Sequence, residues 1–170
     1  APKQLEWLVD CYRMRVDDDE KYGGGNLHGL YNVDPDDQAG EIVSDFSIFC
    51  KLAVQNGVVP QRWDWAAFMA IAAKALGYAF EKSDAQKKWG AENVFDAMMG
   101  GRSLRATAEV VYGSSCQGDD MSTAHELLQE QVLYADVRTL MHTQPTLFLE
   151  VGGAAVWEAL LSTLDLPGTA

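Results

Sequence analysis

The sequence predicts an all-α protein, a bundle of about six to eight helices that forms a single domain over residues 1–170. Three observations favour this class. Apolar residues recur along most of the chain at the three- and four-residue spacing of amphipathic helices. Gly, Asn and Pro separate these stretches at short intervals. No internal repeat and no low-complexity linker divides the chain.

Two amphipathic helices are predicted in the N-terminal third of the chain. The first spans residues 4–21 and ends at the glycine run 23–25, where the backbone must turn. The second spans about residues 39–55 and is closed by Asn56 and Gly57, a pair typical of the end of a helix. Residues 27–37, between the two helices, are expected to form an irregular connector.

A third helix is predicted to start at the sequence Trp63-Asp64-Trp65. The side chain of Asp64 can accept hydrogen bonds from free backbone N–H groups, which makes it a candidate N-cap. Trp63 and Phe68 stand at the two positions of a hydrophobic staple. The helix that follows is rich in alanine, which permits neighbouring helices to approach closely. We therefore expect it to be a central element of the bundle.

Further helices are predicted after residue 83. They are expected at 84–89, stopped by Gly90; at 91–99; at 102–112, capped by Gly113; and at 124–141, opened by a capping box. The last segment carries an apolar stripe at helical spacing, formed by Val156, Leu160, Leu161 and Leu164. The stretch 146–151 fits either a short strand or the entry to a helix.

The acidic balance of the chain limits its partners. The formal net charge is −12 at pH 7, which disfavours nucleic acid and anionic membrane surfaces, because both attract clustered Lys and Arg. A basic protein partner, or solubility alone, fits this charge better. The acids concentrate in residues 17–20, 34–37 and 119–120, and we interpret each run as a solvated helix end or loop. No apolar run reaches about 18 residues, so no membrane-spanning helix is predicted.

The cysteines and histidines form no catalytic or metal-binding pattern. These residues are Cys11, Cys50, Cys116, His28, His125 and His142. The cysteines are odd in number and far apart, which argues against a disulfide framework and against zinc. The histidines stand in no known nucleophile or metal motif, so surface positions are expected for them. We therefore predict a non-catalytic protein without cofactor or metal, in an intracellular location that is cytoplasmic or nuclear.

Two stretches carry polar residues in a pattern that core packing alone does not explain. Glu81 and Asp84 are three residues apart, which places two carboxylates on one face of a helix. Arg102 and Arg105 are also three apart and lie in the first turn of a predicted helix, where the macrodipole disfavours cations. A buried salt-bridge network that joins these Arg residues to Glu81, Asp84 or Glu109 would explain both stretches. The alternative is a pocket for an anion or a peptide carboxylate, lined by Arg102 and Arg105.

An ordered series of short motifs runs through residues 27–113. The motifs are Gly29-Leu30-Tyr31, Asp45-Phe46 with Phe49, Gly57-Val58-Val59-Pro60 with Trp63, Glu81-Lys82-Ser83-Asp84 with Trp89-Gly90, and Leu104-Arg105 leading to Ala108-Glu109-Val110-Val111-Tyr112-Gly113. This series, which covers about half of the chain, resembles the helical region that accompanies MYND-type zinc fingers in a group of fungal proteins of unassigned activity. Those proteins have a tyrosine where this chain has Trp89, a change that keeps an aromatic side chain.

The resemblance implies an interaction or regulatory module, since MYND fingers are generally protein-binding elements. The finger itself is absent, because it needs a dense set of Cys and His ligands that three scattered cysteines cannot supply. The chain is therefore either the helical region cut from a longer protein or a relative that has no finger. In neither case is zinc expected within this chain.

The first functional hypothesis is an all-α interaction or scaffold domain that meets a protein partner through exposed aromatic residues. These residues would form a groove near Trp63, Trp65, Tyr78 and Trp89. The opposing interpretation is that the same side chains fill the core. Their exposure and their distance from one another distinguish the two interpretations.

Two further hypotheses belong to other functional classes. The second is a small-molecule binding protein or cryptic enzyme, whose polar pocket would be formed by Glu81, Asp84, Arg102, Arg105 and Tyr112. The third is self-association of the chain into a homo-oligomer through its last amphipathic segment. Each hypothesis requires its residues to be accessible in the folded protein.

Overall fold

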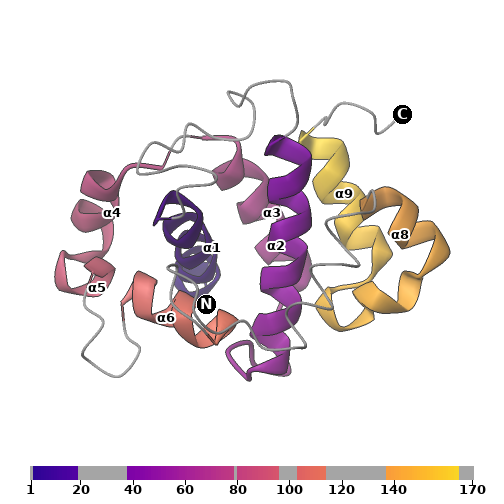
Figure 1. Ribbon diagram of the computed structural model, residues 1–170, viewed down its shortest axis with the longest axis horizontal. Coiled ribbons are helices and arrows are strands. Elements are labelled where there is room, and N and C mark those ends of the chain that lie inside the picture. Colours follow the sequence, from indigo (N-terminus) through magenta and orange to yellow (C-terminus); the bar gives the residue numbers. More distant parts are fainter. Residues whose placement is uncertain (1, 19–37, 79, 96–102, 114–136, 165–170) are drawn as a thin grey trace.

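The computed structural model describes residues 2–18, 38–78, 80–95, 103–113 and 137–164. Over these ranges the chain is helical and contains no β-strand, which confirms the predicted fold class (Figure 1). The elements are α1 (Pro2–Asp18), α2 (Gln38–Gln55), α3 (Trp65–Leu76), α4 (Lys82–Trp89), α5 (Glu92–Phe95), α6 (Leu104–Tyr112), α8 (Val137–Thr143), the 3-10 helix η2 (Pro145–Val151) and α9 (Ala154–Leu164). Helices α4 and α5 lie at one end of the molecule, and α8 and α9 lie at the other (Figure 1).

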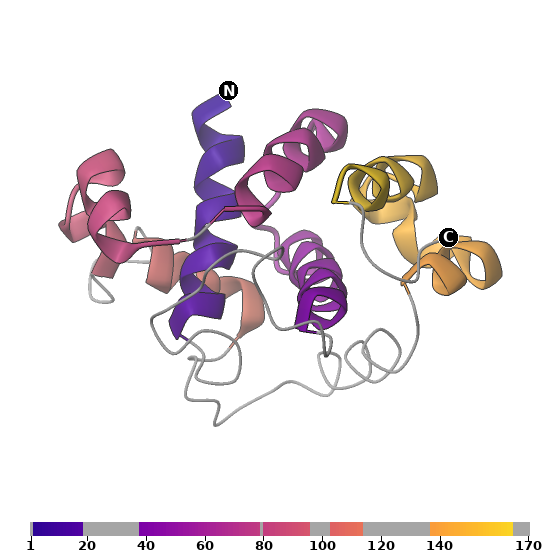
Figure 2. The same cartoon turned by 90° about the horizontal axis from the view of Figure 1, so that it is seen from above.

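Helices α1 and α2 form where the apolar spacing predicts them, and they cross steeply at the centre of the molecule (Figures 1 and 2). Their contact is largely aromatic. The Tyr12 ring packs against Phe46 and Phe49, with ring centroids 4.9 and 5.2 Å apart. The Tyr12 hydroxyl donates a hydrogen bond to the carbonyl oxygen of Ile42 at 2.9 Å, so the buried phenol is satisfied at the helix crossing.

The start of α3 confirms both the predicted N-cap and the predicted staple. The Asp64 carboxylate accepts a hydrogen bond from the backbone N–H of Ala67 at 3.0 Å. The Trp63 and Phe68 rings meet edge to face, with centroids 5.7 Å apart. Helix α3 packs against α1 on one side and against α9 on the other, which confirms its central place in the bundle (Figure 2).

Helices α4 and α6 end as predicted, but their first residues differ from the prediction. Gly90 stops α4 at a φ of 92°, and Gly113 caps α6 at a φ of 71°. Helix α4 starts at Lys82, two residues earlier than expected. Helix α6 starts later than expected, at Leu104, because the Ser103 hydroxyl accepts a hydrogen bond from the N–H of Ala106 and so caps the helix.

Several predicted features fall wholly or partly outside the described residues. Of the helix expected at 91–99, the described part is α5. The glycine run, the connector at 27–37 and the capping box of Thr123 and Glu126 lie outside the described residues. The described end of the helix predicted to finish near residue 141 is α8, which runs to Thr143.

Residues 146–151, which fitted either a short strand or the entry to a helix, are helical. Pro145 opens a 3-10 helix that reaches Val151, so this stretch leads into helical structure. Gly152 and Gly153 follow with φ angles of 96° and 84°, which L side chains rarely adopt, and α9 then begins at Ala154. Among the described helices none is both long and apolar enough to span a bilayer, and the one pair that passes by combined length, η2 and α9, is bent by 88°.

Candidate functional site

The polar stretch around Arg105 forms a network with acids at the end of α1. The Arg105 guanidinium donates from Nε and Nη2 to the two carboxylate oxygens of Asp18, both at 2.9 Å. The Lys82 ammonium lies 2.8 Å from Asp18 and 3.3 Å from Asp17. A shared carboxylate at Asp18 therefore ties α1 to both α4 and α6.

Helix electrostatics explain why these charges meet. Asp17 and Asp18 end α1, where the macrodipole disfavours anions, while Lys82 and Arg105 lie in the first turns of α4 and α6, where it disfavours cations. Pairing the two kinds of misplaced charge offsets both penalties. The interpretation of residues 17–20 as solvated is therefore wrong for their first two members, whose side chains are 1% and 7% exposed.

The structure gives Arg105 an acidic partner that the sequence did not predict. Glu81 and Asp84 are both exposed at the start of α4, and the carboxylate that binds Arg105 in two places is Asp18. Arg102 lies outside the described residues. Arg105 thus takes part in a salt-bridge network, in which Asp18 belongs to a helix 87 positions away in the sequence.

The environment of the network changes the protonation of two of its members. Burial alone would raise the pKa of Asp18, but the hydrogen bonds and charges of Arg105 and Lys82 outweigh it, so the pKa of this carboxyl lies below its ordinary value. Burial alone would lower the pKa of Lys82, but Asp18 and Asp17 raise it above its ordinary value. Both groups are therefore charged at neutral pH.

We expect Asp18→Asn to reduce the free energy of unfolding by about 2 kcal/mol at pH 7, because the variant loses charge-assisted hydrogen bonds to a shielded carboxylate. Because folding lowers the pKa of Asp18, its contribution is complete above about pH 4 and disappears as the pH falls through the folded-state pKa. Urea unfolding of the wild type and the variant at pH 7 and at about pH 2.5 measures this difference.

Asp84→Asn is the matched control, since it neutralises an exposed carboxylate on α4. It should change the free energy of unfolding by less than about 0.5 kcal/mol at either pH. A difference between wild type and Asp18→Asn that stays equal at both pH values would contradict the assignment of this stability to the charged carboxylate.

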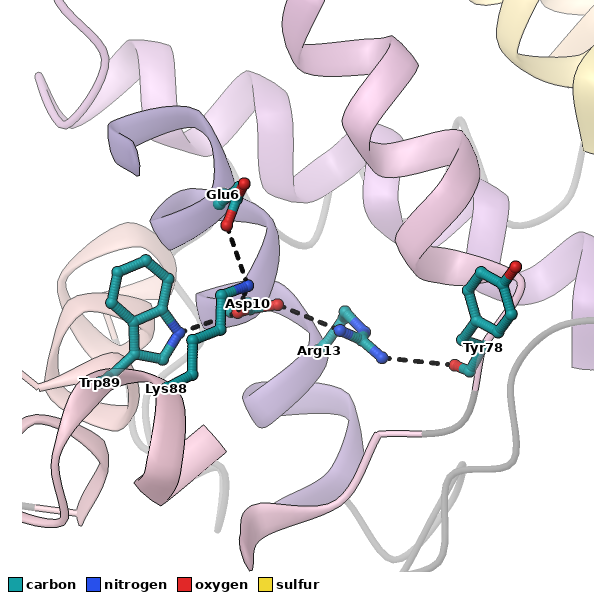
Figure 3. Close-up of polar contacts among 6 residues, drawn as sticks. All are labelled: Glu6, Asp10, Arg13, Tyr78, Lys88 and Trp89. Carbon is teal, nitrogen blue, oxygen red and sulfur yellow. Dashed lines mark hydrogen bonds and ion pairs between the residues drawn. The ribbon is translucent and has the colours of Figure 1, made fainter. Parts of the chain in front are cut away.

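A second network surrounds Asp10, a buried residue in the middle of α1 (Figure 3). One carboxylate oxygen accepts a hydrogen bond from Arg13 at 3.1 Å. The other accepts from Lys88 at 3.1 Å and from the Trp89 indole N–H at 2.9 Å. Lys88 also pairs with Glu6 at 3.0 Å. The C-terminal end of α4 is thereby tied to α1 through one buried acid.

The four aromatic residues expected to share a groove do not lie together. Trp63 and Trp65 both pack on Phe68 at the start of α3. Tyr78, 63% exposed, follows the other end of this helix, whose 12 residues span about 18 Å. Trp89 is part of the Asp10 network at the end of α4 (Figure 3). The four residues therefore do not form one groove, because the length of α3 separates Trp63 and Trp65 from Tyr78. Tyr78 instead lies near the Asp10 network, since its backbone carbonyl accepts a hydrogen bond from Arg13 at 3.4 Å (Figure 3).

Tyr112, which was expected to line a polar pocket, is buried. Its hydroxyl donates to Asp45 at 3.3 Å, and the Arg15 guanidinium lies over its ring, 4.5 Å from the centroid. Burial, assisted by the charge of Asp45, raises its pKa well above the ordinary value. Tyr112 and Arg105 stand at opposite ends of α6, about 10 Å apart along its axis. Each is bound to a different carboxylate, so the two do not converge on one ligand position.

An apolar groove with a volume of about 280 Å³ lies between α3 and α9. The two helices lie side by side (Figure 2). Most of the side chains that line the groove are small: Ala66, Met69, Ala70 and Ala73 from α3, and Ala155, Val156, Ala159, Leu160 and Thr163 from α9.

The burial of these lining residues shows how the groove is built. Met69 and Leu160 are buried and form its floor, while Ala70, Ala155 and Ala159 are exposed. Along each helix the small residues are spaced three or four positions apart, so they form a continuous stripe on one face. The alanine-rich sequence had indicated close helix packing, but part of the α3 stripe instead faces this groove. A comparison of the alanine spacing in the two helices is the signal that could have located it.

The apolar stripe of α9, the basis of the self-association hypothesis, is mostly used within the chain. Leu160, Leu161 and Leu164 are buried in the core, and Val156 is partly buried against it. Two of these residues, Val156 and Leu160, also line the groove. The face of α9 that remains open carries the small residues of the groove.

The two described cysteines are buried, and the described histidine lies at the surface. Burial raises the pKa of the Cys11 and Cys50 thiols well above the ordinary value, so both stay protonated. His142 is exposed. Within the described ranges, no group of three or more His, Cys, Asp or Glu side chains is placed to hold a metal ion. Cys116, His28 and His125 lie outside these ranges.

No protein-family model, no curated protein and no solved structure matches this chain.

Proposed function

We propose that this protein is an interaction or scaffold domain that binds an amphipathic helix of a protein partner in the groove between α3 and α9. The observation that carries the proposal is the groove itself, an open apolar trough between two adjacent helices. Docking of an amphipathic helix into such a trough is a common mode of protein recognition, in which apolar side chains at every third or fourth position act as anchors.

The size and lining of the groove favour side chains of a partner over a complete small molecule. Its volume of about 280 Å³ lies at the lower limit of pockets that enclose drug-sized ligands. Small side chains such as Ala70 and Ala159 let a partner helix approach closely, and Met69 below them offers a flexible apolar floor that adapts to different anchors.

The negative charge of the chain favours a partner helix whose solvent-facing side carries Lys and Arg. A net charge of −12 attracts Lys and Arg, and complementary charge speeds association and disfavours acidic competitors. The resemblance of residues 27–113 to helical regions beside MYND fingers also supports a protein-binding role. We place no ligand at the predicted polar pocket, because Arg105 and Tyr112 are bound to carboxylates of the protein itself.

A synthetic helical peptide of Leu and Lys in an amphipathic order tests the proposal. We expect the unaltered chain to bind it more tightly than a scrambled peptide of equal composition, as measured by fluorescence anisotropy. Ala70→Glu places a charge in the groove and should weaken binding at least about tenfold, which corresponds to about 1.4 kcal/mol.

Ala91→Glu is the matched control, because it adds the same charge at an exposed alanine that does not line the groove. It should leave binding unchanged or strengthen it slightly through charge. Equal binding by the two variants, or equal binding of the ordered and scrambled peptides, would show that attraction is electrostatic only and would overturn the proposal.

A further inference from the structure

Helix α4 differs from its neighbours in how it is held. Its sequence is polar, and its one buried residue is Ala85. By contrast, α3 buries five residues and α9 buries four. An isolated helix of 8 residues is not stable in water, so α4 depends on its contacts with the rest of the protein.

The contacts between α4 and α1 are ionic at both ends. Lys82, at the start of α4, pairs with Asp17 and Asp18 at the end of α1. Lys88, near the other end, pairs with Asp10 and with Glu6. The two helices therefore run antiparallel along this contact.

The spacing of the charges on the two helices matches. Lys82 and Lys88 are separated by about 9 Å along α4, and Asp10 and Asp17 by about 10 Å along α1. Lys82 can therefore contact Asp17 while Lys88 contacts Asp10, and neither helix has to bend. The Trp89 indole adds a hydrogen bond to Asp10 and an edge-to-face contact with the Trp7 ring at 5.1 Å.

In three of these four ion pairs the acid is buried and the lysine is more accessible, whereas in the Lys88–Glu6 pair both side chains are accessible. The Asp10 and Asp17 side chains are almost fully buried, whereas the Lys88 side chain is 44% exposed. Salt screens the accessible Lys88–Glu6 pair most and the pairs with buried acids less, since the Debye length shortens from about 30 Å at 0.01 M to about 3 Å at 1 M ionic strength. Apolar contacts such as those that hold α3 do not weaken in this way.

We propose that α4 is a strap that opens from α1 while the other helices stay packed, and that ionic strength controls how often it opens. Opening uncovers the carboxylates of Asp10 and Asp17, so the strap regulates how much negative charge α1 presents to solvent. The helices that line the α3–α9 groove take no part in the movement. This inference is independent of the proposed partner helix.

Hydrogen–deuterium exchange of the full chain, followed by mass spectrometry, tests the strap. Between about 0.01 M and 1 M NaCl, we expect amides of α4 to exchange about fivefold faster, while those of α3 keep their rate. An α4 rate that does not respond to salt would overturn the proposal. So would an equal acceleration in α3, since that result means global unfolding.

Two double variants with the same loss of charge make the test residue-specific. Lys82→Gln with Lys88→Gln removes the ionic contacts, and α4 should then exchange about fivefold faster at low salt and respond little to added salt. Lys74→Gln with Lys87→Gln alters two exposed lysines and should behave as the wild type. Equal behaviour of the two double variants contradicts the strap, and the salt series on the unaltered chain decides the matter if either variant does not fold.

Discussion

Replacing Trp157 with alanine is expected to reduce the free energy of unfolding by about 3–5 kcal/mol. This side chain is 0% exposed, and its ring packs against Phe46 of α2 and Phe148 of η2, with centroids 6.0 and 5.7 Å apart. Its indole N–H also donates to the carbonyl oxygen of Val151 at 3.0 Å. The substitution therefore opens a large cavity where three elements meet and leaves a buried carbonyl without its donor.

Chemical denaturation monitored by circular dichroism measures this effect. Trp157→Phe is the matched control, because it retains an aromatic ring but loses the indole N–H. It should cost about 1–2 kcal/mol, the loss expected for an unsatisfied buried acceptor and an incompletely filled site. A cost below about 1 kcal/mol for the alanine variant would mean that Trp157 does not organise the contact of α9 with the core.

The second large effect is expected from Gly152→Ala, which should destabilise the protein by about 3 kcal/mol. Gly152 has a φ of 96°, where an L side chain costs about 1–2 kcal/mol. An added Cβ would also lie 2.7 Å from the Cβ of Trp65 and 3.3 Å from a methyl carbon of Val156. Because the Trp65 Cβ is fixed to the backbone at the start of α3, the chain before α9 must shift, and such overpacking costs about 1–3 kcal/mol.

The neighbouring glycine separates these two causes. Gly153 has a φ of 84°, but an added Cβ there meets no atom within 4 Å. Gly153→Ala should therefore cost only the backbone strain of about 1–2 kcal/mol. If both variants are equally destabilised in thermal unfolding, the close approach of Gly152 to Trp65 contributes nothing and the predicted clash is wrong.

The ends of the helices could be predicted because they depend on neighbours in the sequence. Asp64 caps α3 through an N–H three residues away, and Gly113 ends α6 through its own backbone angles. Helix α6 shows the limit of such prediction. The helix starts two residues later than predicted, because the Ser103 hydroxyl caps it. Apolar spacing does not reveal which residue caps a helix.

The amino-acid sequence was enough to predict the all-α class, the places where α1, α2 and α3 form, and the unusual character of the stretch around Arg105, because helical periodicity and helix-end charges are local properties. Three features became visible in the folded protein: Arg105 pairs with Asp18, α3 separates Trp63 from Tyr78, and a groove lies beside α9. These outcomes depend on how helices distant in the sequence cross, and the spacing within one helix does not specify its partner.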